Sequence, residues 1–423
     1  MTGTWPCPGD LPLALRDNPE DGVPLIDPET GDPLRRDTGH SLVGKGGSRW
    51  PIVDGIPFLR TGRDALRKAA LTALDAGNGR SARIALLADQ DDYARRPPPG
   101  PAALDRLVAS VDDGSASLRD AMAGLNFGAV ADYFAHRPST PTYLSGLALL
   151  DLHLPQGAAV VEVACGIGHF LRELASRGIP AMGLDVVFAK LWLARRFIVP
   201  GGVRLICADA MAGWPLGRAP GPTVAFCHDA FYFLSDKSGV LASFRRTIGE
   251  QGRILIGHAH NSGFDHRGVA GEPLRPEAYA GLLPGCVLYD DAELAEWAWG
   301  DRPAVPREPA ELSGVEAVAL AWDASGQIAA AERPSPASPQ LVIPAADRVL
   351  TLNPLLEERE ALLTPRWPSP EFEAEYSAGS GYLLGEPMPR FPIPCRLDPG
   401  TEGREERERL ARRRILLDLP ERW

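Results

Sequence analysis

The stretch from Ala158 to Phe170, AAVVEVACGIGHF, constrains the fold of this chain more than any other. It begins with the β-branched residues Val160, Val161 and Val163 and passes through a turn of small residues. It then continues into HFLREL, whose apolar residues have helical spacing. A strand, a small-residue turn and a helix together let a nucleotide-like ligand approach bare backbone beside a helix N-terminus. The sequence therefore predicts an α/β domain built around this turn.

An alternation of strand-like and helix-like segments runs through residues 158–260. The strand-like segments are AAVVEV, IPAMGLD, VRLICAD, TVAFCHD and GRILIGHAH. This alternation predicts a parallel sheet with helices on both faces, and ligands of such sheets bind at the carboxyl ends of the strands. Polar residues stand at those predicted ends: Glu162, Asp185, Asp209, His228, Asp229, His258, His260 and Asn261.

The turn after the first strand lacks the glycine pattern of a dinucleotide-binding site. That pattern, G-x-G-x-x-G, needs a third glycine where this chain has Leu171. The turn reads E-x-A-x-G-x-G instead, with Glu162, Ala164, Gly166 and Gly168 at its fixed positions. This resembles motif I of the class I S-adenosylmethionine-dependent methyltransferases, with Ala164 in place of the first glycine. The resemblance implies that these four residues surround the methionine part of the cofactor.

Three later positions extend the resemblance over residues 133–260. Asp185 ends the next strand about 20 residues further on, where a carboxylate can accept hydrogen bonds from both ribose hydroxyls. Asp209 and Ala210 follow the third strand, where the family contacts adenine, and CHDAFYF follows the fourth, where the family closes over cofactor and substrate. The resemblance implies an α/β fold with a Rossmann-like class I methyltransferase sheet and S-adenosyl-L-methionine as the cofactor.

Residues 131–152, the lid segment, precede the first strand at the position of a lid helix in related methyltransferases. Tyr133, Phe134, Arg137 and Tyr143 are the residues here that could contact a ligand. The donor fork of Arg137 suits the carboxylate of the cofactor, although a solvated surface arginine is an equal alternative. Core packing is the alternative for the aromatic residues.

Histidines gather near the ends of the later strands. Four of the eight in the chain lie between His228 and His266, and the ordinary pKa of histidine suits proton abstraction near neutrality. We predict that His228, His260 and Tyr143 handle the acceptor, and a structural role is the alternative for each. Strand alternation aims His258 and His260 to one face, but no third and fourth ligand stands at short spacing, so we expect no metal.

Residues 1–60 have turn-forming sequences throughout, and RWPIVDGIPFL predicts a strand, an Asp-Gly turn and a second strand. This segment resembles the closing hairpin of the Trm112-like small zinc-ribbon domain. Cys7 stands where the first cysteine pair of that family begins, but Asp10 replaces its partner and no second pair follows. One thiolate cannot hold a tetrahedral zinc ion. We therefore expect a degenerate, zinc-ribbon-like domain without metal.

The rest of the chain divides by composition. Residues 61–136 are rich in Ala, Leu and Arg at helical spacing and predict a helical linker or cap. Residues 137–300 form the expected methyltransferase core, and residues 301–423 its final strands and a Pro-rich C-terminal extension with one solvated terminal helix. Within this last part, residues 315–332 predict two strands that supply the antiparallel edge of the central sheet.

Composition excludes several classes of partner. The net charge is -11, and the one charge-dense stretch, near the C-terminus, mixes both signs, which argues against nucleic-acid binding. No segment approaches the roughly 18 apolar residues of a membrane span, and the N-terminus does not resemble a signal peptide. The six cysteines are scattered, as in proteins with reduced thiols, so we expect a cytoplasmic location.

The predicted function is S-adenosylmethionine-dependent methylation of a small-molecule acceptor, a metabolite, natural product or sugar-like compound, at oxygen or nitrogen. Three alternatives remain open at this point. One is a Rossmann-type oxidoreductase, against which the missing third glycine argues. The second is a non-catalytic scaffold on a methyltransferase fold, in which the degenerate ribbon and the C-terminal third bind a partner protein. The third is that the fold binds the cofactor but uses it for another reaction.

Overall fold

The computed structural model describes residues 22–90, 96–266, 270–300, 302–326, 328, 339–398, 400 and 402–423. Cys7 and Asp10, on which the zinc-ribbon comparison depends, lie outside these ranges, as does most of the second strand expected within 315–332. Within the described ranges, no helix is long and apolar enough to cross a membrane.

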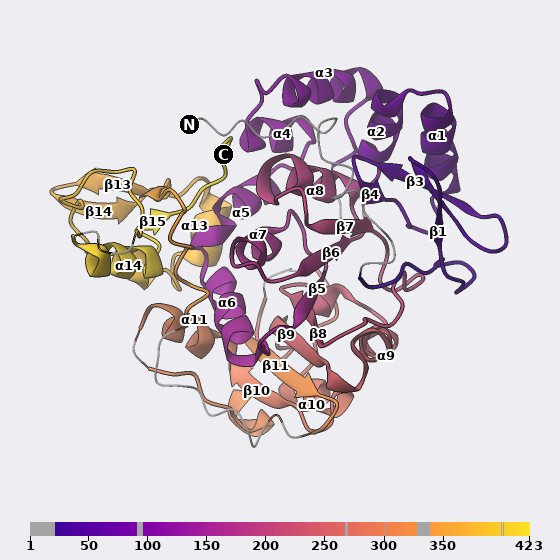
Figure 1. Cartoon of the computed structure of the whole chain (residues 1–423). Helices are drawn as coiled ribbons and strands as arrows, with labels where there is room; N and C mark the ends of the chain where they lie inside the picture. The colour runs from indigo at the N-terminus through magenta and orange to yellow at the C-terminus, as the bar shows by residue number, and fades with distance from the viewer. Residues whose placement is uncertain are drawn as a thin grey trace.

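Seven strands form the central sheet in the order β10-β11-β9-β8-β5-β6-β7 (Figure 1). Their bounds are β5 (Ala159–Val163), β6 (Ala181–Asp185), β7 (Arg204–Cys207), β8 (Thr223–His228), β9 (Arg253–His260), β10 (Val287–Asp290) and β11 (Ala317–Asp323). Strands β5 to β9 are parallel, as predicted, and β11 is antiparallel to both of its neighbours. The expectation that residues 315–332 supply the sheet edge was wrong, because β10 pairs with the outer side of β11.

The strand order reverses between β5 and β8, which pair with each other although β6 and β7 lie between them in sequence. Every residue of β8 is buried, as expected of a strand covered on both faces. Such a reversal opens a crevice at the carboxyl ends of the two strands. The turn that follows β5 and the loop that follows β8 therefore meet at the position where this fold binds its ligands.

Helices cover both faces of the sheet. Their bounds are α5 (Val130–His136), α6 (Pro141–His153), α7 (His169–Ser176), α8 (Phe188–Leu193), α9 (Lys237–Ile248), α10 (Pro276–Leu282) and α11 (Asp291–Trp299). Residues of α6, α7 and α11 share one buried cluster with Val160, Val224 and Leu255. Residues of α9 and α10 share another with Val161 and Ile254. The alternation of β5 and β9 residues between the two clusters shows a three-layer arrangement.

The N-terminal part forms a four-stranded antiparallel meander beside the edge of β7 (Figure 1). Its strands are β1 (Arg35–Thr38), β2 (Ser41–Val43), β3 (Arg49–Val53) and β4 (Ile56–Pro57). The predicted Asp-Gly turn joins β3 to β4, with φ of 53° at Asp54 and 74° at Gly55. The backbone N–H of Leu59 donates to the carbonyl of Cys207 at 2.7 Å, so this region covers the free edge of β7.

The predicted helical region follows the meander as α1 (Asp64–Asp75), α2 (Gly79–Leu87), α3 (Pro101–Asp112) and α4 (Leu118–Gly124). Buried residues of these helices pack together with Phe188 and Trp192 of α8. The helical region therefore shares a hydrophobic core with the sheet domain and is a packed cap, not a linker.

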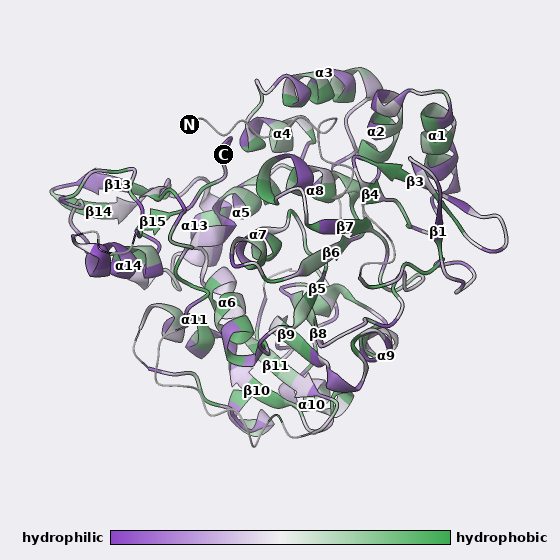
Figure 2. Cartoon of the chain, viewed as in Figure 1, coloured by the Kyte–Doolittle hydropathy of each residue, from purple (hydrophilic) through white to green (hydrophobic). Residues whose placement is uncertain are grey.

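The C-terminal extension, residues 339–423, packs against the lid segment and α7. Its elements are β12 (Thr351–Leu352), β13 (Leu356–Arg359), β14 (Leu362–Pro365), α13 (Pro370–Tyr376), α14 (Arg404–Arg412) and β15 (Leu416–Leu417). Helix α14 carries many hydrophilic residues, as predicted, but Leu410 and Ala411 are buried against the core that contains α6 (Figure 2). Tyr382 donates a hydrogen bond to the carbonyl of Ser139, and Arg172 of α7 pairs with Asp418 at 2.8 Å.

Candidate active site

The turn after β5 has a left-handed backbone at three of its positions. The φ angles are 59° at Ala164, 56° at Gly166 and 83° at Gly168. A Cβ on Gly168 would lie 2.8 Å from Cγ1 of Val199, and one on Gly166 would lie 3.0 Å from Cε1 of Phe134. The two glycines are thus required by conformation and by space, whereas Ala164 adopts the left-handed region at a small cost.

Glu162 lies in β5 at the point where the strand order reverses. It is only 3% exposed, and its Oε2 atom has no hydrogen-bond partner among the described residues. Burial raises the pKa of this carboxyl well above its ordinary value. A buried carboxyl oxygen without a donor is rare, and it marks a place that a polar ligand group can complete.

Asp185 joins the end of β6 to the glycine turn. Its Oδ2 accepts from the backbone N–H of Gly166 at 2.9 Å, and its Oδ1 accepts from that of Val187 at 2.9 Å. The residue therefore lies where the sequence placed it, beside the turn, and it also holds that turn in shape. Asp209 and Ala210 follow β7 and are half-buried, and Asp209 accepts from the backbone N–H of Met211 at 2.9 Å.

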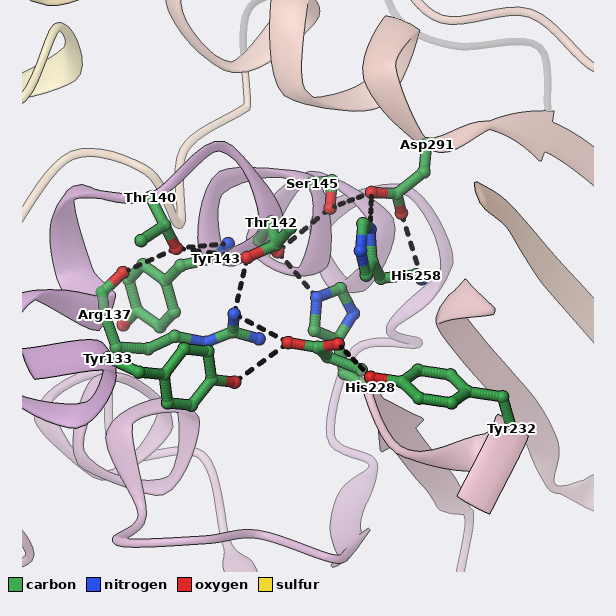
Figure 3. A network of polar contacts seen from close by, with 11 residues as sticks. Tyr133, Arg137, Thr140, Thr142, Tyr143, Ser145, His228, Tyr232, His258 and Asp291 are labelled. Atoms are coloured by element: carbon green, nitrogen blue, oxygen red, sulfur yellow. Dashed lines mark hydrogen bonds and ion pairs between the residues drawn. The ribbon is translucent and has the colours of Figure 1, made fainter. Parts of the chain in front are cut away.

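A buried polar network connects the lid segment to the loop after β8 (Figure 3). Arg137 lies 2.9 Å from Oδ2 of Asp229, and the Tyr133 hydroxyl donates to the same oxygen at 2.8 Å. The Tyr232 hydroxyl donates to Oδ1 of Asp229 at 3.0 Å. Burial alone would raise the pKa of Asp229, but the positive charges around it, Arg137 first and then His258, His228 and His260, together hold this pKa well below its usual range.

Arg137 was expected to face the carboxylate of the cofactor. The structure pairs it with Asp229 of the protein, and its side chain is 5% exposed, so the solvated alternative does not apply. The Arg137–Asp229 pair fixes the lid segment over the end of β8.

His228 lies between α6 and β9. Its Nε2 donates to the carbonyl of Thr142 at 2.6 Å, while Nδ1 is buried without a partner among the described residues. Burial lowers the pKa of His228 to about 4, so the ring is neutral at physiological pH. Its ring lies 5.1 Å from that of Phe170 and 5.7 Å from that of Phe226, measured between centroids.

Because Gly257 has no side chain, the ring of His228 can pack directly against its backbone. A Cβ at position 257 would lie 2.1 Å from Nδ1 of His228, and the aromatic neighbours prevent that ring from moving aside. We expect Gly257→Ala to reduce the free energy of unfolding by about 1–3 kcal/mol, measured by urea denaturation. The control is Gly281→Ala in α10, where nothing lies within 4 Å of the added Cβ and stability should stay the same or rise slightly. Equal stability of the two variants would contradict the crowding described here.

His258 forms a second buried pair with Asp291, the first residue of α11. Nδ1 of His258 lies 2.8 Å from Oδ2 of Asp291, and its backbone N–H donates to Oδ1 at 3.0 Å (Figure 3). Ser145 of α6 donates to the same Oδ2 at 2.8 Å. Burial would lower the pKa of His258, but the Asp291 carboxylate outweighs it and raises this pKa to about 9.

His260 is stacked between two aromatic rings. Its ring centroid lies 3.8 Å from that of Tyr232 and 4.1 Å from that of His266, and both pairs are nearly parallel. Burial, followed by the charge of His258, lowers the pKa of His260 to about 3. Tyr143, the third predicted acceptor residue, is buried elsewhere, and its hydroxyl donates to the carbonyl of His169 at 3.4 Å.

Three residues of this site escaped the sequence analysis. Asp291 was interpreted only as the start of a helix, although an acid directly after a predicted strand is a signal that could have found it. Tyr376 of α13 is buried near Asp229 and Arg137, and burial raises the pKa of its hydroxyl. Glu375 precedes it on the same helix and is exposed. No local pattern distinguishes these two residues within a Pro-rich extension.

Comparison with known proteins gives one family match. A family model described as a methyltransferase domain matches residues 161–256, which run from β5 into β9. No curated protein matches the chain. The matched segment covers the strands on both sides of the strand-order reversal, together with the glycine turn, Asp185 and Asp229.

Several solved structures are similar over parts of the chain. A methyltransferase from Thermotoga maritima is 17% identical with a TM-score of 0.33, over 45% of this chain and 90% of its own. One from Thiobacillus denitrificans, in complex with S-adenosyl-L-homocysteine, is 23% identical with a TM-score of 0.30, over 39% and 74%. A chain of the complex between the Haloferax volcanii Trm112 methyltransferase activator and a methyltransferase is 17% identical with a TM-score of 0.29, over 42% and 73%. These values are too low to support an inference about the acceptor.

The strand order and the family match together define the class of enzyme. Residues 161–256 match a methyltransferase domain, and on this match the protein is a methyltransferase.

Proposed function

We propose that the enzyme transfers a methyl group to an oxygen or nitrogen atom of a small-molecule acceptor, a metabolite, natural product or sugar-like compound. The observation that carries this proposal is the position of the methyltransferase-domain match. The matched segment contains the glycine turn, Asp229 and Glu162, whose Oε2 atom has no hydrogen-bond partner among the described residues. His258 and His260 follow it at the end of β9.

The residues at this edge fit the cofactor. Gly166 and Gly168 keep the turn free of side chains, and Oε2 of Glu162 would accept a hydrogen bond from the amino group of the methionine part. Asp185 would accept hydrogen bonds from the ribose hydroxyls. Asp209 and Ala210 would contact the adenine. When bound, S-adenosylmethionine supplies an electrophilic methyl group to the acceptor. Proximity and orientation then account for much of the rate that the protein provides.

The acceptor would lie beside the loop after β8 and the end of β9. His260 is the best placed of the three predicted acceptor residues, because it lies at the end of β9 and its ring is neutral. It would take a proton from an acceptor hydroxyl or amine at one of these nitrogens. His228 would hold α6 in register with β8 through Thr142, and Tyr143 would support α7.

The lid segment and α13 cover the carboxyl ends of the parallel strands, and this favours a small acceptor. Arg137 and Tyr133 of the lid segment reach across to Asp229, and Tyr376 of α13 is buried near the same group. A long polymer would need an open groove, and the net charge of -11 repels nucleic acid. We propose that the acceptor is a free metabolite, and we also propose a cytoplasmic location, which the scattered cysteines support.

We also propose that residues 1–60 are a degenerate Trm112-like domain that has kept a packing role. Its support is the resemblance of RWPIVDGIPFL together with the position of β3 and β4 beside β7. The domain would cover the edge of the sheet within the same chain, followed by the helical cap of residues 61–136, the core of residues 137–300 and the extension of residues 301–423.

Calorimetry with S-adenosylhomocysteine tests the proposed function. We expect one binding site per chain and, with S-adenosylmethionine and a suitable acceptor, release of S-adenosylhomocysteine. A fluorescence titration with NADH should show no binding, in contrast to a Rossmann-type oxidoreductase. The absence of binding heat from folded protein would remove the proposal. Binding of S-adenosylhomocysteine without methylation of any small molecule, with a co-purifying partner protein, would favour a scaffold.

A further inference from the structure

Three side chains with metal-binding atoms meet at the ends of β8 and β9. Asp229, His258 and His260 each offer one ligand atom, and these atoms lie within 4.8 Å of one another. The two histidines are buried, and the carboxylate is 12% exposed. The sequence analysis expected no metal because it searched at short spacing, whereas the third side chain comes from the end of a different strand.

Each histidine has a nitrogen that can bind a metal. Nδ1 of His258 is held by Asp291, so Nε2 is the nitrogen that remains. His260 is 7% exposed, and one of its ring nitrogens lies within 4.8 Å of the ligand atoms of the other two side chains. A neutral imidazole can bind a metal ion through its unprotonated nitrogen.

Asp229 keeps a free lone pair as well. Its Oδ2 accepts two hydrogen bonds, from Tyr133 and Arg137, but its Oδ1 accepts only one, from Tyr232. A carboxylate has about four acceptor positions, so Oδ1 can bind an ion without losing any of these three contacts.

Asp291 would not bind the metal itself. Its carboxylate orients His258 through the ring nitrogen that faces away from the ion. Metal-binding histidines almost always donate their other ring N–H to a carboxylate, a carbonyl or water, and the His258–Asp291 pair has this form.

We propose that Asp229, His258 and His260 form a binding site for a divalent transition-metal ion. Two imidazoles and one carboxylate are a donor set suited to iron, zinc, nickel or cobalt, and they leave coordination positions open. The ion would take the place of a proton on Nε2 of His258. Binding of the ion does not depend on the proposed function. Only the further step, in which an acceptor oxygen occupies an open position, rests on it. With the ion bound, the unprotonated nitrogen of His260 would be a ligand and would no longer serve as the base proposed above.

A titration of the metal-stripped full-length protein with Co²⁺ tests the site, because visible absorption reports how the ion is coordinated. We expect one Co²⁺ per chain and competition by Zn²⁺ in calorimetry. His260→Ala and Asp229→Asn should weaken binding at least about tenfold, and Asp291→Asn by about 10–100-fold through His258. The matched control is His40→Ala in the N-terminal meander, whose ring pairs with the exposed Asp75 and which should bind like the wild type.

The outcomes separate folding, metal binding and methyl transfer. Circular dichroism and S-adenosylhomocysteine binding show whether each variant is folded. Absence of Co²⁺ and Zn²⁺ binding to the wild type would overturn the inference, even if S-adenosylhomocysteine binds. Unchanged metal affinity in folded His260→Ala and Asp229→Asn would overturn it too, since the ion would then lie elsewhere. Metal binding without cofactor binding would leave the site intact and remove the proposed function.

Discussion

Replacing Arg137 with methionine should lower the free energy of unfolding by about 3–5 kcal/mol, because it leaves a buried carboxylate without its cation. The pair joins the lid segment to the loop after β8, with side-chain exposures of 5% for Arg137 and 12% for Asp229. Methionine preserves most of the apolar stem, so the change removes charge and hydrogen bonds more than volume. The measurement is urea denaturation followed by tryptophan fluorescence.

Two further variants control this prediction. Arg80→Met breaks the Arg80–Asp105 pair, whose side chains are 45% and 51% exposed, and should cost no more than about 1 kcal/mol. The double variant Arg137→Met/Asp229→Asn removes both buried charges, so its loss of stability should fall short of the sum of the single losses by about 1 kcal/mol or more. Strict additivity would show that the two groups do not depend on each other.

Asp185→Ala should weaken S-adenosylhomocysteine binding at least about tenfold, which corresponds to about 1.4 kcal/mol. Two losses act in the same direction. The ribose loses its proposed acceptor, and the backbone N–H groups of Gly166 and Val187 lose the carboxylate that holds the glycine turn. Isothermal calorimetry on the full chain measures the change.

One further variant distinguishes loss of the ribose contact from loss of the turn contacts, and a second variant serves as a control. Asp185→Asn keeps one acceptor oxygen for the turn but removes the charge, so intermediate affinity would indicate that the turn matters more than the ribose contact. Asp64→Ala removes a carboxylate that is 73% exposed on α1 and should bind like the wild type. If Asp185→Ala retained wild-type affinity, the position of the ribose assigned here would be wrong.

Much of the fold could be predicted from local sequence. The runs AAVVEV, TVAFCHD and RILIGHAH are apolar and β-branched because the parallel strands are buried on both faces, and this leaves a strong local signal. The left-handed turn that carries Gly166 and Gly168 leaves a similar signal. The sheet edge was missed because the pairing of β10 with β11 joins segments about 30 residues apart, which no local pattern records.

The sequence predicted which residues lie at the site, but it did not predict which of them form hydrogen bonds and ion pairs with one another. Asp229, His258 and His260 were all expected at strand ends, where parallel strands place their polar residues. The pairing of Arg137 with Asp229 and of His258 with Asp291 depends on tertiary contacts across 92 and 33 positions of the chain. These contacts decide which groups are charged, so the sequence could name candidates for acid–base work but could not assign their protonation states.

The packing of the C-terminal extension has a consequence for the order in which the enzyme matures. The carbonyl of Ala135 beside the lid segment accepts a hydrogen bond from the Trp423 ring, 288 positions later in the chain. The backbone N–H of Leu118 likewise donates to the carbonyl of Arg422. Chains fold progressively during synthesis, N-terminal parts first. A ribosome-bound chain that has completed all seven central strands still lacks these contacts, so the bonds from the extension to Ala135 and Leu118 are among the last to form.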